Sequence, residues 1–147
     1  MQNEFRQTVQ LRWADMDSNA HMRHSVYYDL GASIRIEFLA MHGVTFPLME
    51  EMHFGPVLFR EEAVFRKEIR YGDALYINLQ VPKCRRDGSR FSFRHEIRRE
   101  DGTLCAVLQV DGAWIDTQKR KLTKPPEIVR AMFEAAPKTT DFQWLDE

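Results

Sequence analysis

The stretch RWADMDSNAHMRHSVYYDLGASIRIEFL, residues 12–39, contains the change of hydrophobic period that decides the fold. Apolar residues from Phe5 to Trp13 alternate with polar ones, and this period of two predicts a half-buried strand. From Ser25 onward the apolar residues recur at helical spacing, which predicts one long helix that stops near Gly43. The apolar face of this helix contains Val26, Leu30, Ile34, Phe38 and Met41.

Strand patterns dominate the rest of the chain, after a loop that contains Pro47. Tight turns at Asp87–Gly88 and Asp101–Gly102 separate successive strands, so the sheet is predicted to be antiparallel. A short helix is expected from Pro126, and a loose tail after Pro137. The four predicted strands cover Pro56–Ile69, Leu75–Val81, Phe91–Ile97 and Leu104–Asp116.

One long helix against an antiparallel sheet predicts an α+β fold, formed by a single domain over residues 1–147 with its core at about 5–133. The small residues Gly31 and Ala32 would let the helix lie close to the sheet. A sheet of five or more strands around one helix leaves its edges uncovered. We therefore expect a homodimer, formed by sheets that join edge to edge.

The composition narrows the class of protein. The chain has 147 residues, is 44% hydrophobic and carries a formal net charge of −1, which suits one globular domain and gives no strong attraction for nucleic acid or anionic membranes. No apolar run is long enough to span a bilayer, and no secretory signal is apparent at the start. Cys84 and Cys105 stand apart without a metal-like or redox-like pair, so we expect a cytoplasmic protein with reduced thiols.

Asp17 is the first candidate for chemistry, because it lies between the predicted strand and the predicted helix. The free N–H groups of the helix start, near His24 and Ser25, favour negative charge and could stabilise an oxyanion. A carboxylate on the other side of a bound carbonyl could attack it or activate water, which would suit acyl transfer. The alternative is that Asp17 only caps a loop turn, and spacing alone favours that alternative.

The neighbouring polar residues have simpler predicted roles. Asp15 would face the same way as Asp17 in an extended chain, but such an aspartate more often holds a turn through backbone amides. His21 and His24 lack the partners of a zinc site. His21 is expected to pack under the turn and to hydrogen-bond to backbone, and His24 is expected to orient the substrate or the loop. Ser25 is expected to cap the helix.

Two further groups leave alternatives open. Tyr27 packs on the helix or lines a pocket. The basic clusters at Cys84–Arg86 and Gln118–Lys121 are solvated surfaces, or they hold the phosphates of a nucleotide-tailed ligand. His95, like the other isolated histidines, is expected to be structural, and neither cysteine has a nucleophile's setting.

Residues 12–39, together with RYGDAL at 70–75 and DGAWIDTQKRKLTKPPEIV at 111–129, resemble the hotdog-fold acyl-CoA thioesterases of the 4-hydroxybenzoyl-CoA thioesterase family. The resemblance covers about residues 5–133 and implies a sheet wrapped around a long central helix. It implies hydrolysis of acyl-CoA, or sometimes of acyl carrier protein thioesters, without metal or cofactor. The second aspartate of the Asp-x-Asp motif, Asp17, would be the catalytic carboxylate, and the amide near His24 would bind the thioester carbonyl.

The resemblance also implies sites at dimer interfaces and dimers that often pair into tetramers. His24, Ser25 and Tyr27 would then line the substrate site, and Arg85, Arg86, Lys119 and Arg120 would hold the CoA tail on a surface shared between subunits. This chain has Ala20 where many members have glycine, and bulkier residues at Met22-Arg23-His24, so its acyl group is expected to differ.

Two other functions remain to be weighed against hydrolysis. The first is a non-catalytic binder or sensor of acyl-CoA on the same scaffold, which burial of Asp17 away from any cleft would favour. The second is a dehydratase, which is less favoured because that branch resembles this chain less and uses a histidine with an acid.

Overall fold

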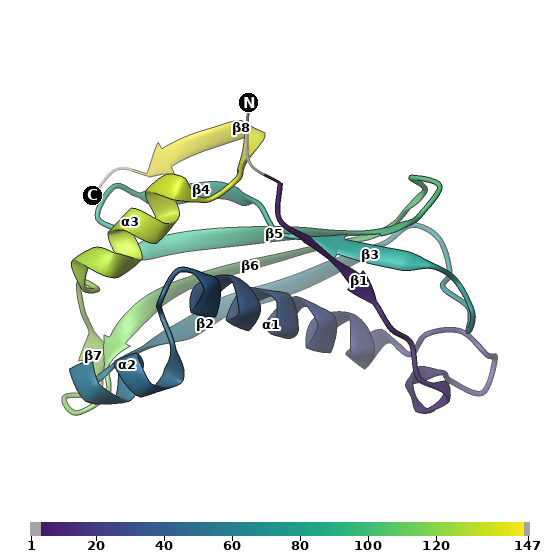
Figure 1. Ribbon diagram of the computed structural model, residues 1–147, viewed down its shortest axis with the longest axis horizontal. Coiled ribbons are helices and arrows are strands. Elements are labelled where there is room, and N and C mark those ends of the chain that lie inside the picture. Colours follow the sequence, from purple (N-terminus) through teal and green to yellow (C-terminus); the bar gives the residue numbers. More distant parts are fainter. Residues whose placement is uncertain (1–3, 146–147) are drawn as a thin grey trace.

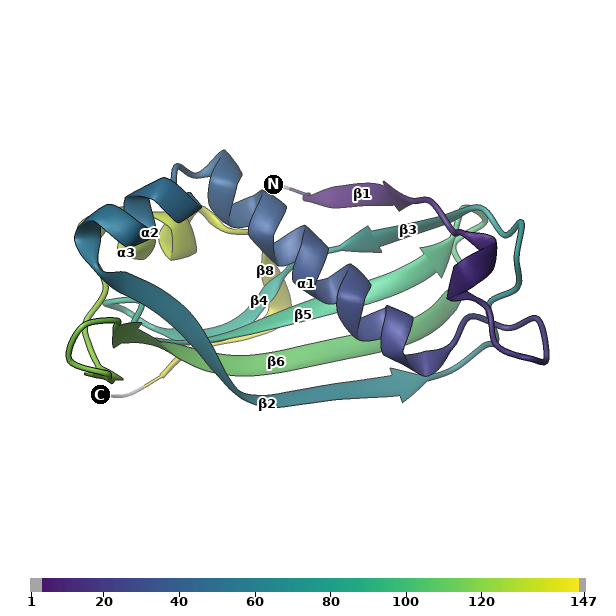
Figure 2. The same cartoon turned by 90° about the horizontal axis from the view of Figure 1, so that it is seen from below.

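A long helix crosses one face of a curled sheet in the computed structural model, which describes residues 4–145 (Figure 1). The helix is α1 (His24–Met41), and it runs diagonally over the strands when the molecule is turned by 90° (Figure 2). This arrangement confirms the predicted α+β fold with a central helix.

The sheet has eight strands, and nearly all neighbours are antiparallel. β5 is central because it pairs with β3, β4 and β6, while β1 pairs with β3, and β2 and β7 pair with β6. β8 pairs with β4 and is the one parallel neighbour among the described strands. The strands are β1 (Arg6–Val9), β2 (Phe54–Phe65), β3 (Leu75–Asn78), β4 (Val81–Arg85), β5 (Arg90–Arg99), β6 (Leu104–Asp116), β7 (Lys121–Leu122) and β8 (Lys138–Leu145).

Gly31 lets α1 lie close to the sheet, as its size predicted. A Cβ atom added at Gly31 would lie 3.3 Å from side-chain atoms of both His95 and Leu108. Most of the predicted apolar face is buried there, but Met41 is 61% exposed. Met41 was expected in the core and lies instead in the last turn of the helix, just before the chain turns away at Gly43 with a φ of +83°.

Two predictions for the first third of the chain were wrong. The strand ends at Val9, and Trp13–Asp15 form a short 3-10 helix, because Asp15 accepts hydrogen bonds from Arg12 and closes the turn. The loop around Pro47 contains helix α2 (Phe46–Met52), whose start is capped by the hydroxyl of Thr45 accepting from the N–H of Leu48.

The expected loose tail is also a correction, because β8 lies there. Phe142 and Trp144 fall two residues apart, so they share one face of the strand, and their rings meet edge to face at 4.9 Å. Both pack against the core. The predicted short helix is confirmed as α3 (Glu127–Ala135), with Val129, Met132 and Phe133 buried.

Gly112 provides a test of sheet packing. A Cβ at this position would lie 2.5 Å from the carbonyl oxygen of Val57 and 2.7 Å from the ring of Phe91. Because the backbone oxygen cannot move cheaply, Gly112→Ala is expected to lower the free energy of unfolding by about 1–3 kcal/mol in urea denaturation. Gly55→Ala is the control, since its nearest atom would be 3.8 Å away. Equal stability of the two variants would contradict the packing described.

Candidate active site

Asp17 closes the loop that leads into α1. Its Oδ1 accepts hydrogen bonds from the backbone N–H of Asn19 at 2.8 Å and of His21 at 3.1 Å. Its own N–H donates to the carbonyl of His21, and Met16 pairs with Met22 across the loop. Ala20 adopts a φ of +61°, a left-handed conformation that glycine adopts more readily than alanine.

The Asp17 side chain is both a turn cap and an exposed carboxylate. The N–H groups of Asn19 and then His21 hold the pKa of Asp17 below its usual value, because they stabilise the charged form. One oxygen serves the loop, and among the described residues no hydrogen bond engages the other, Oδ2. The two roles left open by the sequence are therefore compatible.

Arg23, and not Ser25, occupies the cap position of α1, so the predicted serine cap is wrong by two residues. The Arg23 N–H donates to the carbonyl of Asp15 at 2.9 Å, and its guanidinium bonds the carbonyl of Ala14 and the Ser25 hydroxyl. These contacts fasten the helix start to the preceding turn. His24 and Ser25 are exposed in the first helical turn, where backbone N–H groups lack intrahelical partners.

Asp15 has the structural role that the sequence favoured. It is 5% exposed, and its two oxygens accept from the backbone and guanidinium of Arg12. The bonds from Arg12 lower the pKa of Asp15. Asp15 and Asp17 therefore do not act as a carboxylate pair.

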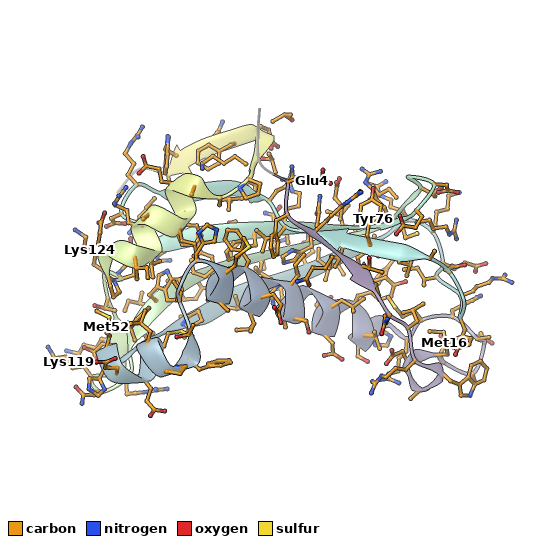
Figure 3. All side chains as sticks on the ribbon, viewed as in Figure 1. Glu4, Met16, Met52, Tyr76, Lys119 and Lys124 are labelled. Carbon is orange, nitrogen blue, oxygen red and sulfur yellow. The ribbon has the colours of Figure 1, made fainter. Side chains whose placement is uncertain are left out.

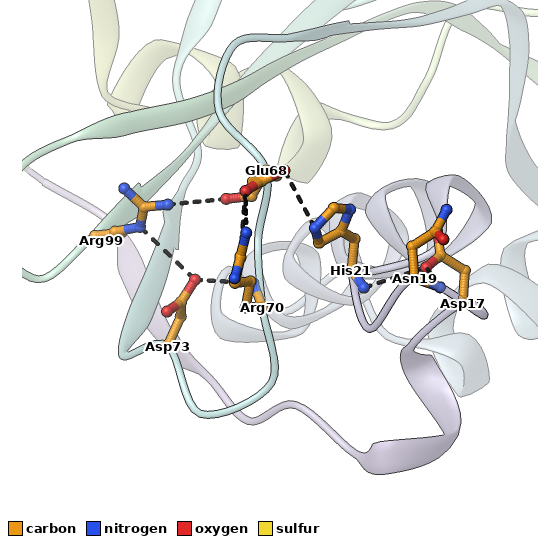
Figure 4. Close-up of polar contacts among 7 residues, drawn as sticks. All are labelled: Asp17, Asn19, His21, Glu68, Arg70, Asp73 and Arg99. Atoms are coloured by element: carbon orange, nitrogen blue, oxygen red, sulfur yellow. Dashed lines mark hydrogen bonds and ion pairs between the residues drawn. The ribbon is translucent and has the colours of Figure 1, made fainter.

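A cluster of ion pairs that the sequence did not reveal contacts the Asp17 loop through His21 (Figure 4). His21 was expected to bond to backbone, but its Nε2 lies 3.1 Å from Oε2 of Glu68. Arg70 pairs with Glu68 at 2.7 Å, and Asp73 accepts from the N–H of Arg70 while lying 3.7 Å from Arg99. The alternating charges of the segment 66–73 were the available signal, but only the folded chain brings His21 to them.

Tyr27 lies in the first turn of α1. It is 4% exposed, and its ring packs edge to face on Phe65 at 4.9 Å. Burial, with smaller effects from Cys105 and Asp17, raises the pKa of Tyr27 to about 12, so its hydroxyl keeps its proton. Of the two roles that the sequence left open, the structure shows the packing role.

The predicted basic residues lie at the end of the molecule opposite to the Asp17 loop. Lys119 and Met16 mark opposite ends of the long axis in Figure 3, and Arg120 follows Lys119 in the β6–β7 turn. Arg85 is the last residue of β4 and Arg86 begins the β4–β5 connection, with the guanidinium of Arg86 4.7 Å from the centroid of the Trp144 ring. One subunit therefore does not bring this group together with Asp17.

Neither cysteine is a nucleophile candidate. Both are buried, and burial raises the pKa of the Cys84 thiol to about 11 and also raises that of Cys105. Over residues 4–145, the side chains of histidine, cysteine, aspartate and glutamate form no group of three suited to a metal ion. In the same range, no helix is long and apolar enough to cross a membrane.

A polar chain in the core was missed, although His95 was correctly expected to be structural. The Nη1 of Arg35 lies 3.0 Å from His95 Nε2, and His95 Nδ1 lies 3.0 Å from the carbonyl oxygen of Asn78. Because arginine only donates, Nε2 accepts and Nδ1 carries the proton. Burial lowers the pKa of His95 to about 3, so the ring is neutral. The signal was Arg35 itself, one helical turn after Gly31 on the apolar face.

Several solved structures have a fold similar to that of this chain. A Staphylococcus aureus protein solved in complex with CoA has a TM-score of 0.86 at 21% identity, covering 95% of this chain and 90% of that one. A 1,4-dihydroxy-2-naphthoyl-CoA thioesterase from Synechocystis has a TM-score of 0.79 at 20% identity, covering 89% and 96%. A DHNA-CoA thioesterase from Staphylococcus aureus has a TM-score of 0.77 at 19% identity, covering 90% and 87%. No curated protein matches the chain.

These likenesses establish the hotdog fold that the family resemblance implied. The family comparison is more direct, because it matches residues 11–133, from just before the 3-10 helix to the buried face of α3. The chain belongs to the thioesterase-like superfamily.

Proposed function

We propose that this protein hydrolyses acyl-CoA thioesters to a free acid and CoA. The observation that carries the proposal is the exposed carboxylate of Asp17, held by backbone amides in the loop that precedes α1. Membership of the superfamily supports thioester hydrolysis in general. The related fold solved with CoA and the two naphthoyl-CoA thioesterases support CoA as the carrier, and acyl carrier protein is the alternative carrier.

In this mechanism the thioester carbonyl lies at the start of α1, where the N–H of His24 polarises it. Asp17 then acts in one of two ways. As general base it takes a proton from water, whose oxygen adds to the carbonyl carbon; as nucleophile it forms an anhydride that water later opens. In both routes the C–S bond breaks, the CoA sulfur leaves as a thiolate, and it takes up a proton that the attacking water releases. His24, Ser25 and the protonated hydroxyl of Tyr27 line the site.

The proposed active form is a homodimer joined along β2. This strand pairs with β6 on one side, and among the described residues no strand covers its other side. It exposes four apolar side chains, which is unusual for an edge that faces water: Leu58, Phe59, Val64 and Phe65. Dimers could pair further into tetramers.

A two-fold axis through the middle of β2 reverses the direction of the second subunit. The basic end of the partner would therefore lie beside the Asp17 end of the first subunit. In this arrangement Arg85, Arg86, Lys119 and Arg120 of one subunit can hold the phosphates of a CoA thioester whose carbonyl lies in the other.

Replacing Asp17 tests the catalytic role. Asp17→Asn keeps the shape of the side chain and removes its charge, so the rate of thiol release from acyl-CoA should fall about 100-fold or more. Asp101→Asn is the matched control, because Asp101 is also exposed and also accepts a backbone N–H in a tight turn. If Asp17→Asn were as active as wild type, the chemistry would lie elsewhere. Binding of acyl-CoA without turnover by wild type would favour the non-catalytic binder.

The pH dependence separates Asp17 from a histidine base. Because its pKa is lowered, Asp17 stays ionised from neutral pH down to its ordinary range near 4. We expect kcat/KM to be flat through pH 6.5 and to fall only below about pH 4, measured where the fold is intact. A loss of rate centred near pH 6.5 would point instead to an imidazole base.

A charge on the open edge tests the dimer. Val64→Glu would bury a carboxylate against the partner, so sedimentation velocity should show monomers at concentrations where wild type is dimeric. Leu122→Glu, at an exposed apolar residue outside β2, should leave the dimer intact. A monomeric wild type, or a Val64→Glu dimer as tight as wild type, would exclude this interface.

A further inference from the structure

His21 joins the Asp17 loop to the connection between β2 and β3 (Figure 4). Two hydrogen bonds hold its backbone against Asp17. The N–H of His21 donates to Oδ1 of Asp17 at 3.1 Å, and the N–H of Asp17 donates to the carbonyl of His21 at 2.8 Å. The other N–H on that oxygen comes from Asn19, two residues on, and belongs to the local turn. The direction of the Asp17 carboxylate therefore depends on where His21 lies.

The β2–β3 connection holds His21 in place from the other side. His21 forms an isolated antiparallel bridge with Arg70, and the N–H of Met22 donates to the carbonyl of Ile69 at 2.7 Å. The side chain adds one more contact, because Nε2 of His21 lies 3.1 Å from Oε2 of Glu68. A carboxylate only accepts, so Nε2 carries a proton in this contact.

Glu68 is itself fixed, because its two oxygens have different partners. Oε1 accepts from the guanidinium of Arg70, with Nη2 at 2.7 Å, and Oε2 faces His21. The backbone carbonyl of Glu68 accepts from Nη2 of Arg99, at the end of β5, at 2.8 Å. Through Glu68, the side chain of His21 is therefore connected to a central strand of the sheet.

The contact between His21 and Glu68 is too exposed to contribute much to global stability. The two side chains are 31% and 49% exposed, and pairs with this exposure add little to the free energy of unfolding. Its effect is instead on the direction in which the loop presents the carboxylate. Catalysis is sensitive to this direction, because a displacement of about 1 Å can lower a rate about 100-fold.

We propose that His21 and Glu68 are positioning residues for Asp17: their contact holds the His21 N–H against Oδ1, so that the other oxygen, Oδ2, faces the thioester carbonyl or the attacking water. The inference rests on the proposed function and adds two residues to its machinery. Neither residue touches the substrate in this role, and both act through the loop.

Variants of the pair separate positioning from folding. His21→Ala and Glu68→Ala remove the contact. Each should lower kcat about 10–100-fold and change KM less than about twofold, because the attacking group is displaced while the substrate contacts are kept. The double variant should lose no more than either single variant, since both remove the same contact. His21→Gln and Glu68→Gln each keep a hydrogen bond between the two side chains, so they should recover most of kcat.

Glu127→Ala is the matched control. It breaks an exposed ion pair with Arg130 at 2.6 Å on α3, at the other end of the molecule (Figure 1). Its kcat should equal that of wild type, and urea denaturation should show that every variant is folded under the assay conditions. Full activity of His21→Ala and Glu68→Ala, or a loss that neither glutamine variant recovers, would overturn the positioning role.

An NMR titration of the Asp17 carboxyl carbon tests the inference without a thioester. The N–H groups of Asn19 and His21 both lower the pKa of Asp17, so loosening the second should raise that pKa toward its ordinary value in Glu68→Ala. Loss of the negative charge of Glu68 would by itself lower the pKa of Asp17, so the sign distinguishes a loosened loop from a change of charge. Glu68→Gln keeps the contact and should not raise it.

The titration also separates this inference from the proposed hydrolysis. If no thioester is hydrolysed but the pKa of Asp17 rises in Glu68→Ala, the proposed function fails and the positioning of Asp17 stands. If that pKa falls or stays the same, the positioning fails whatever the activity.

Discussion

The close seating of α1 on the sheet at Gly31 is the constraint on which the rest of the structure depends. A Cβ atom at this position would lie only 3.3 Å from side-chain atoms of His95 and Leu108, so any larger residue would have to lift the helix or displace its neighbours. This close contact fixes the direction of α1 over the sheet, and so it determines which segments lie at each end of the helix. The first turn meets the Asp17 loop, and the second half of the helix walls a cavity over Trp114.

Periodicity predicted the long helix and most of the long strands, but it merged β3 and β4 into one strand over Leu75–Val81. The change from a period of two to helical spacing located α1, and the Asp–Gly pairs located the turns between antiparallel strands. Periodicity failed where the hydrogen bonds of a single side chain set the local structure. Asp15 folds Trp13–Asp15 into a 3-10 turn despite the alternation around it, and Thr45 starts a helix in a segment that Pro47 marked as loop. β8 was missed because its stability comes from the distant strand β4.

The candidate site likewise combines contacts between residues that are close in sequence with contacts between distant segments, and only the first kind could be predicted. Asp17 and His24 were found because their relation is set by a few residues of chain and by the start of one helix. His21–Glu68 and Arg35–His95 were not, because each joins segments 47 to 60 residues apart that only the sheet brings together. Their sequence signals, a charged run and an arginine on an apolar face, have many solvated counterparts in other proteins.

Both halves of α1 favour a negatively charged partner, although for different reasons. The helix start favours developing negative charge, and a protonated Tyr27 hydroxyl and an ionised Asp17 lie beside it. The middle of the helix instead buries the positive charge of Arg35, with Glu61 of β2 as its nearest carboxylate. Within one subunit these two regions are separated along the helix axis, and the strand between them and solvent is the uncovered edge. A second copy placed antiparallel on that edge would bring the anion-favouring start of one helix to the cation-bearing middle of the other.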